Sequence, residues 1–339
     1  MTRAINKKNH SSQSISITNR DNSIFGRRVY SVIILTVLIL IIPCFSFADN
    51  KTKPPAGERA VNHGETAPAN ETLPLYHFGI PPYQKGQTVD EIRGLYQPML
   101  KWLGKQVGCR FDFIGGETYE DMIEMVAEGK VQLAGLGPVP YVVAKQKNPQ
   151  IKLLLTELKW NPERTKLVDA YHGYILVLKT RNDLNNLKDL KGKPFAFVSH
   201  HSTSGYQYPN ALLREKGIIP DEYFSKVYFL GSHPRVTDAI AAGSVAAGAT
   251  WDYNWNRAKK KHGDIFKILL ETPPIPNLTI VSHPSLPAEI AAKIKKVLPS
   301  IDQALLKGLP SAGFAVRSDD FYDGIRLIVE KEKRREENK

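Results

Sequence analysis

Two hydrophobic periods alternate along residues 75–156. Short apolar runs typical of buried strands are separated by segments in which apolar residues recur every three or four positions, as on one face of a helix. The predicted strands are 75–80, 110–114, 131–136 and 151–156, and the predicted helices are 88–107, 118–128 and one that starts at Gly137-Pro138. Strands and helices that alternate with short connections favour a parallel, doubly wound sheet.

The same alternation starts again after a long apolar strand at residues 171–179. Further strands are predicted at 195–198, 227–230, 245–250 and 265–269, with helices at 205–216, 234–243 and 251–262, and then a strand at 279–282 and helices near 287–306 and 318–334. The last pieces have no sheet of their own, so we expect them to return to the first lobe. The pattern therefore predicts two α/β lobes, 74–178 plus 274–339 and 179–273, around a hinged cleft.

An uncharged apolar run at residues 29–47 lies near the N-terminus. Arg27 and Arg28 precede the run, and small residues stand at −3 and −1 before Asp49, which is the layout of a secretory signal peptide. The run also approaches the roughly 20 residues that span a bilayer, so an uncleaved inner-membrane anchor is the alternative. Residues 1–48 are thus predicted to be a signal peptide or an anchor, and 49–73 a disordered linker. Both alternatives place the body of the protein in the periplasm or otherwise outside the cytoplasm, with membrane contact only through this segment.

Composition and charge narrow the function classes. The 339 residues are 42% hydrophobic and 24% charged, which is typical of globular proteins. Residues 1–48 hold six basic residues and one acidic residue, so the net charge of +12 leaves +7 for the rest. Without a helix-turn-helix, zinc-finger or aromatic-basic motif, nucleic-acid binding is not expected. Cys44 and Cys109 are the two cysteines, which excludes a paired-cysteine metal site in the body of the protein.

Sequence motifs of enzymes are also missing. The sequence has no Gly-Lys-Ser/Thr phosphate loop and no Gly-x-Ser-x-Gly elbow, the motifs of many ATPases and of α/β hydrolases. We therefore expect no enzymatic activity, no cofactor and no metal.

The most informative stretch follows the predicted strand at 195–198. Ser202, Thr203, Ser204 and Gly205 stand between that strand and the next predicted helix. Hydroxyls and the free N–H groups of a helix N-terminus form a ready anion site. Ser and Thr are also ordinary helix caps, and for the triplet alone a cap is the simpler interpretation. Ligands of doubly wound sheets bind beyond the carboxyl ends of the strands, and the turns 80–83, 115–119 and 137–138 also follow predicted strands.

Six segments together resemble a known family. They are Tyr96-Gln97-Pro98-Met99-Leu100, Gly137-Pro138 through Tyr141 and Ala144, Leu187 to Lys193, Ser202-Thr203-Ser204-Gly205-Tyr206, Gly231-Ser232-His233 and Pro274-Ile275-Pro276-Asn277. In order and spacing the chain from about 75 to 305 resembles the substrate-binding proteins of phosphonate, phosphite and phosphate ABC transporters. The resemblance implies a two-lobed type II periplasmic binding protein, in which each lobe is a doubly wound, mostly parallel sheet and the ligand binds in the cleft between the lobes. It also implies hinge closure on the ligand and an ABC transporter permease as partner.

The resemblance implies site residues as well. The oxyanion would be held by Ser202, Thr203 and Ser204, by His233 after the next strand, and by Tyr119 and Tyr171. Hydroxyls and helix amides suit a tetrahedral oxyanion, because they supply donors from several directions without a buried counter-charge. A protonated His233 would add a positive charge, whereas for the residue alone a helix cap or a buried, hydrogen-bonded histidine is the simpler interpretation. Tyr119 could equally be an ordinary packed aromatic residue.

Two positions depart from the family pattern. Aminophosphonate binders of the family carry carboxylates that bind the ammonium group of the ligand. In this chain Tyr253, with Asp252 beside it, and Leu278 stand at those positions. We therefore expect Tyr253 and Asp252 to contact the ligand, and the ligand to be a compact oxyanion or one with an apolar or aromatic substituent. Because Trp251, Tyr253 and Trp255 cannot share one helix face, at least one of them is expected to point at the cleft.

Other interpretations of the sequence stay open. The same cleft could belong to a membrane-anchored sensor for a different small ligand that feeds no transporter. His200 and His201 are adjacent on a loop and have no metal-ligand partners at a suitable spacing, so we expect a solvated or supporting role for them. The sequence assigns no role to His172.

Overall fold

A computed structural model describes residues 73–83, 88–161 and 164–338. All of these residues belong to one compact unit. The predicted leader (1–48), and the predicted linker (49–73) except for its last residue, lie outside the described residues. Among the helices that the structure describes, none is both long and apolar enough to cross a membrane.

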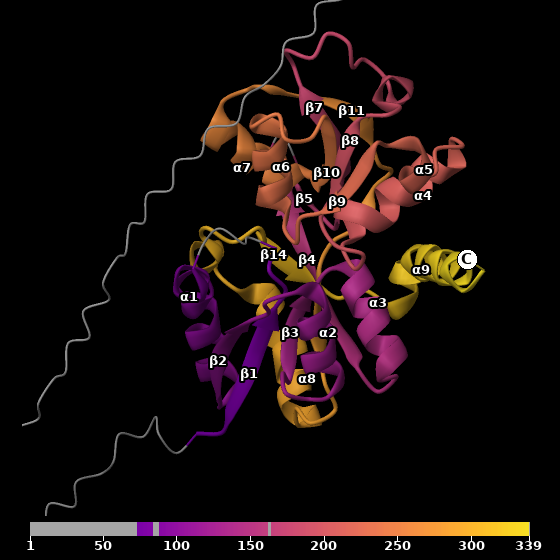
Figure 1. Cartoon of the computed structure of the whole chain (residues 1–339). Coiled ribbons are helices and arrows are strands. Elements are labelled where there is room, and N and C mark those ends of the chain that lie inside the picture. Colours follow the sequence, from indigo (N-terminus) through magenta and orange to yellow (C-terminus); the bar gives the residue numbers. More distant parts are fainter. Residues whose placement is uncertain (1–72, 84–87, 162–163, 339) are drawn as a thin grey trace, which may run out of the picture. The chain divides into compact units, whose positions relative to one another are not determined.

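The first sheet has the strand order β14-β4-β13-β3-β1-β2, and β5 pairs with β4 (Figure 1). Its strands are β1 (Leu75–Ile80), β2 (Arg110–Gly115), β3 (Leu133–Leu136), β4 (Lys152–Trp160), β5 (Leu167–Val168), β13 (Thr279–Ser282) and β14 (Gly313–Ala315). As the sequence predicts, β1 pairs in parallel with both β2 and β3. The strand β13 is antiparallel to both β3 and β4, because it enters the sheet when the chain returns from the second lobe.

Helices cover both faces of this sheet. They are α1 (Val89–Val107) and α8 (Ala288–Val297) on one face, and α2 (Tyr119–Ala127) and α3 (Pro138–Lys147) on the other. Successive strand residues point to opposite faces, so Leu133 packs in one apolar cluster with α1 and α8, and Ala134 packs in another with α2 and α3. A capping box between Thr88 and Glu91 starts α1, which satisfies two backbone N–H groups. The last helix, α9 (Asp323–Glu337), packs against α3.

The second sheet has the order β11-β7-β10-β8-β9. Its elements are β7 (Gly173–Leu178), β8 (Pro194–Phe197), α4 (Tyr208–Glu215), α5 (Pro220–Tyr223), β9 (Lys226–Phe229), α6 (His233–Ala241), β10 (Ala247–Trp251), α7 (Asp252–His262) and β11 (Phe266–Glu271). The strand β8 is parallel to β9 and β10, and β7 is antiparallel to β10 and β11. The predicted fold of two mostly parallel α/β sheets is confirmed. In each sheet an interior antiparallel strand is the first one after a crossing between the lobes.

The first crossing lies before Gly173, so the predicted boundary at residue 178 is wrong. The apolar run predicted as one strand over 171–179 is divided: β6 (Ala170–Tyr171) pairs with β12 (Ile275–Pro276), and β7 joins the second sheet. A continuous apolar run does not show where the chain changes sheets, because both segments are buried. The second crossing lies at β12. Below, lobe 1 and lobe 2 denote the parts built on the first and second sheets, and the crossing ribbon denotes β6 with β12.

Candidate functional site

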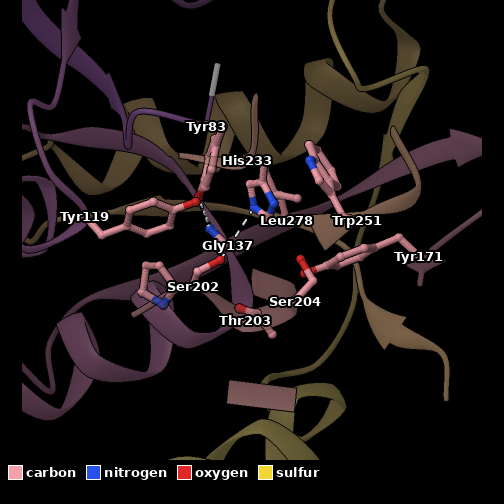
Figure 2. Close-up of a pocket in the computed structure, with 11 residues that line it drawn as sticks. Tyr83, Tyr119, Gly137, Tyr171, Ser202, Thr203, Ser204, His233, Trp251 and Leu278 are labelled. Carbon is pink, nitrogen blue, oxygen red and sulfur yellow. Dashed lines mark hydrogen bonds between the residues drawn. The ribbon is translucent and has the colours of Figure 1, made fainter. Parts of the chain in front are cut away.

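A small pocket lies where loops of the two lobes meet (Figure 2). It is lined by Tyr83, Tyr119, Gly137, Pro140, Tyr171, Ser202, Thr203, Ser204, His233, Trp251 and Leu278. The cavity volume is about 20 Å³. On the same scale one buried water needs roughly 10–15 Å³. In this conformation the pocket therefore has room for about one water.

Most of these residues stand at the carboxyl ends of strands or at helix N-termini. Tyr83 and Gly137 follow β1 and β3, and Tyr119 is the first residue of α2. In lobe 2, His233 is the first residue of α6 and Trp251 is the last residue of β10. In open α/β sheets, ligands bind beyond the carboxyl ends of the strands, and this pocket lies there. The helices α2, α3 and α6 begin at the pocket, so the positive ends of their dipoles point towards it.

The predicted Ser-Thr-Ser loop forms the lobe 2 floor of the pocket. A helix was expected from residue 205, but a π-helical turn, Thr203–Gln207, comes first and α4 starts at Tyr208. Ser202 Oγ accepts a hydrogen bond from the Gly205 N–H at 3.1 Å, so Ser202 does cap the turn. A Cβ on Gly205 would lie far inside van der Waals distance of the Val198 side chain and Ser202 Oγ. The turn therefore depends on glycine at this position.

Thr203 links the loop to lobe 1. Its Oγ1 accepts a hydrogen bond at 2.9 Å from the N–H of Val139, in the first turn of α3, and both residues are buried. The N–H of Gly137, which precedes α3, donates to the Tyr83 hydroxyl. Two N–H groups at the start of α3 are thus held by side-chain oxygens that line the pocket.

His233 is fixed as a neutral hydrogen-bonding group. Its Nδ1 lies 3.1 Å from Thr250 Oγ1, and its Nε2 lies 3.5 Å from Ser202 Oγ. Burial, together with the positive charge of Lys159, lowers the pKa of His233 to about 3. His233 therefore adds no positive charge at neutral pH, because burial disfavours its protonated form. Of the alternatives that the sequence left open, the structure shows a buried, hydrogen-bonded histidine at the expected position.

The tyrosines of the pocket remain protonated. Burial is the main cause that raises the pKa values of Tyr83, Tyr119 and Tyr171 above the ordinary value. The indole Nε1 of Trp251 is buried and has no hydrogen-bond partner within the described part of the chain. Because buried polar groups are nearly always satisfied, this donor indicates that a ligand or water completes the site.

The structure brings together six of the eight predicted site residues: the Ser-Thr-Ser triplet, His233, Tyr119 and Tyr171 all line the pocket. Tyr253 and Asp252 do not line it. The Tyr253 hydroxyl points to lobe 1 and donates to the Gly308 carbonyl at 3.3 Å, and Asp252 accepts from the N–H groups of His172 and Tyr253 at 3.3 and 2.6 Å. Trp251 is the aromatic residue of this stretch that faces the pocket, because it is still on the strand.

The unassigned histidines lie outside the lining. His200 stacks on Phe229 with ring centroids 3.9 Å apart, and His201 Nδ1 lies 2.8 Å from Glu120 Oε2 across the lobes. His172 Nδ1 lies 2.9 Å from the Thr272 carbonyl oxygen. Over the residues that the structure describes, no group of three or more His, Cys, Asp or Glu side chains is placed to hold a metal ion.

Sequence reasoning missed two buried charges near the pocket. Glu157 and Lys159 lie on β4, which continues to Trp160, whereas the predicted strand ends at residue 156. Charged residues normally end a buried strand pattern, and no local signal showed that these two are covered. Tyr83 and Pro140 were also missed as individual residues, although the turn at 80–83 pointed to the right strand end.

Comparison with known proteins assigns the chain to a family. Residues 78–322 match the model of a family described as the periplasmic substrate-binding protein of phosphonate ABC transporters. The chain belongs to this family. The predicted resemblance is therefore confirmed, and the family is one of transport proteins rather than enzymes.

Similar proteins agree with the assignment. Over 266 residues, 71% of this chain and 81% of the relative, the chain is 28% identical to the phosphate-import protein PhnD of Mycolicibacterium smegmatis. Two solved structures share the fold. One is a binding protein component of an ABC phosphonate transporter from Pseudomonas aeruginosa (19% identity, TM-score 0.68, 77% of this chain and 87% of that chain). The other is PhnD1 of Prochlorococcus marinus in complex with methylphosphonate (20% identity, TM-score 0.67, 76% and 98%).

Proposed function

We propose that this protein captures a small phosphorus oxyanion, namely phosphate, phosphite or a short alkylphosphonate, in the pocket between its lobes. The family and its relatives support the substrate class. The observation that carries the proposal is the set of neutral donors that converge from both lobes. The hydroxyls of the Ser-Thr-Ser loop come from lobe 2, and the Tyr119 hydroxyl comes from lobe 1 (Figure 2).

Neutral donors suit a ligand that must be released again. Hydrogen bonds from hydroxyls and helix N–H groups to a charged oxygen are strong, and helix dipoles add positive potential. None of the residues that line the pocket is an acid, arginine or lysine. Such a site selects for the tetrahedral shape and oxygen count of the ligand.

In the structure the two sets of donors already lie together, so opening of the hinge would admit the ligand and closure would hold it. Thr203 already contacts the start of α3, so an oxyanion seated on the loop would sit against both lobes. Closing the lobes excludes water from the ligand and creates a surface that an ABC transporter permease can recognise. Rotation of two rigid lobes about a few connecting residues is a common mode of ligand capture.

A thermal-shift screen tests the proposal. The full chain, purified in a mild detergent, is heated with phosphate, phosphite, methylphosphonate, ethylphosphonate or sulfate. A ligand at 100 times its dissociation constant stabilises the fold by about 2.7 kcal/mol, which raises the melting temperature measurably. We expect a shift with at least one phosphorus oxyanion, confirmed by titration calorimetry. If no phosphorus oxyanion shifts the melting temperature, the proposed function is wrong.

A further inference from the structure

Lys159 is buried beside the pocket. Its side chain extends from β4, and the residue is only 7% exposed. Its ammonium nitrogen lies 4.2 Å from the ring centroid of Trp251 and 4.6 Å from that of Tyr171, and it makes no hydrogen bond to any residue that the structure describes. Both rings line the pocket and lie next to each other in Figure 2. The ammonium group therefore lies immediately beyond two ring walls of the site.

Two carboxylates interact electrostatically with the same ammonium group, although neither forms an ion pair with it within the described residues. Glu157 stands two residues earlier on β4, so its side chain is on the same face of the strand, and it is buried with Oε2 unpaired among the described residues. Asp252 follows Trp251 directly and is half-buried. Burial lowers the pKa of Lys159, and the nearby carboxylates of Asp252 and Glu157 oppose that shift. Burial likewise raises the pKa of Glu157.

Aromatic rings and carboxylates together are the groups that bind an ammonium ion. A cation over a tryptophan or tyrosine ring is attracted by the ring, and the attraction is greater when the cation is desolvated. Burying a lysine without hydrogen bonds is unfavourable, and apolar residues of similar size commonly replace buried ions without loss of stability. Because the free energy of burying Lys159 is unfavourable and an apolar residue would avoid it, we infer that its ammonium group acts at the adjacent pocket.

We propose that Lys159 occupies a cation-binding subsite next to the oxyanion pocket and thereby excludes ligands that carry an ammonium substituent. This inference rests on the proposed function. A ligand ammonium directed towards Trp251 and Tyr171 would approach a like charge behind these rings, and the space behind them is already filled, so both effects discriminate against it. An uncharged substituent, or none, meets neither obstacle.

Ethylphosphonate and 2-aminoethylphosphonate form a matched pair that tests the subsite, because they differ by one amino group. Calorimetry on the full-length wild type should give a dissociation constant for 2-aminoethylphosphonate at least about tenfold above that for ethylphosphonate, which corresponds to about 1.4 kcal/mol. Lys159→Ala removes the ammonium group and leaves the space between the rings and the carboxylates free. The dissociation constant for 2-aminoethylphosphonate divided by that for ethylphosphonate should therefore fall at least about tenfold. Lys159→Met, which removes the charge and keeps the volume of the stem, should give an intermediate ratio.

Lys152→Ala is the matched control, because Lys152 is an exposed lysine on the same strand, and its ratio should equal that of the wild type. If Lys159→Ala does not fold, Lys159→Met and the wild-type pair carry the test. The inference is overturned if the wild type binds both phosphonates equally well, or if a folded Lys159 variant keeps the wild-type ratio. If the wild type binds no phosphorus oxyanion at all, the proposed function itself is wrong and the subsite falls with it.

Discussion

Thr203→Val tests whether the Ser-Thr-Ser loop binds the ligand. Valine has nearly the same shape as threonine but lacks the hydroxyl, so the packing of the loop is kept. In the structure Thr203 Oγ1 accepts the buried Val139 N–H at 2.9 Å, which leaves the hydroxyl hydrogen to donate to a ligand oxygen. A hydrogen bond to a charged group contributes about 1.5–3 kcal/mol, so the dissociation constant should rise about tenfold to 150-fold.

The substitution has a second effect that the assay must separate. It leaves the Val139 N–H without its acceptor, and an unsatisfied buried donor costs about 1–3 kcal/mol. Thr156→Val is the matched control, because Thr156 is a buried threonine of lobe 1 whose hydroxyl bonds to Tyr322 outside the pocket. Titration calorimetry with the tightest phosphorus oxyanion should show the loss for Thr203→Val and not for Thr156→Val. A dissociation constant for Thr203→Val within about twofold of the wild type would refute the loop assignment.

Three further predictions concern pH, packing and closure. The pKa of His233 in the folded protein is about 3, below its ordinary value near 6.5, so the unfolded chain binds the proton more tightly than the folded chain. The free energy of unfolding is therefore highest above about pH 6.5 and decreases as the pH falls below that value. Relative to His233→Gln, the wild type should lose roughly 2 kcal/mol of unfolding free energy between pH 7 and pH 5, measured by urea denaturation; parallel losses would contradict this. Gly205→Ala forces a methyl group against Val198, so it should lower the free energy of unfolding by about 1–3 kcal/mol in the same assay. If the variant is as stable as the wild type, the turn is not packed as described. Glu120→Gln weakens a partly exposed contact with His201 across the lobes, so calorimetry should show at most about a fivefold loss of affinity. A larger loss would assign this pair a direct role at the ligand.

The sequence was sufficient where local rules decide structure. The apolar period of residues 88–107 predicted α1 to within one residue, and the hydroxyl triplet after β8 pointed to the pocket floor. Hydroxyls, glycines and strand ends carry their own signal, because their chemistry determines both the turn and the ligand class.

Long-range packing was beyond this reasoning. The alternation at residues 251–255 showed that the aromatic side chains point in different directions, but only the end of β10 decides that Trp251 faces the pocket and Tyr253 does not. Lys159 lies on a strand that a local pattern would end earlier, and it is covered by rings that come from residues 171 and 251. Burial of a charged residue by segments distant in sequence cannot be predicted from the residues next to it.

The crossing ribbon has a consequence for the thermodynamics of capture. Ile275 pairs with Tyr171, and Pro276 pairs with Ala170, so the two connections between the lobes are bonded to each other and must bend as one strip. Two independent flexible connections would have to lose many conformations when the lobes close, whereas a paired strip has few to lose. Since the entropy of ordering is subtracted from the contact energy of a complex, such a hinge leaves more of that energy as affinity. Tyr171 lies both on the strip and in the pocket wall, so the proposed rotation of the lobes would also move a residue that lines the binding site.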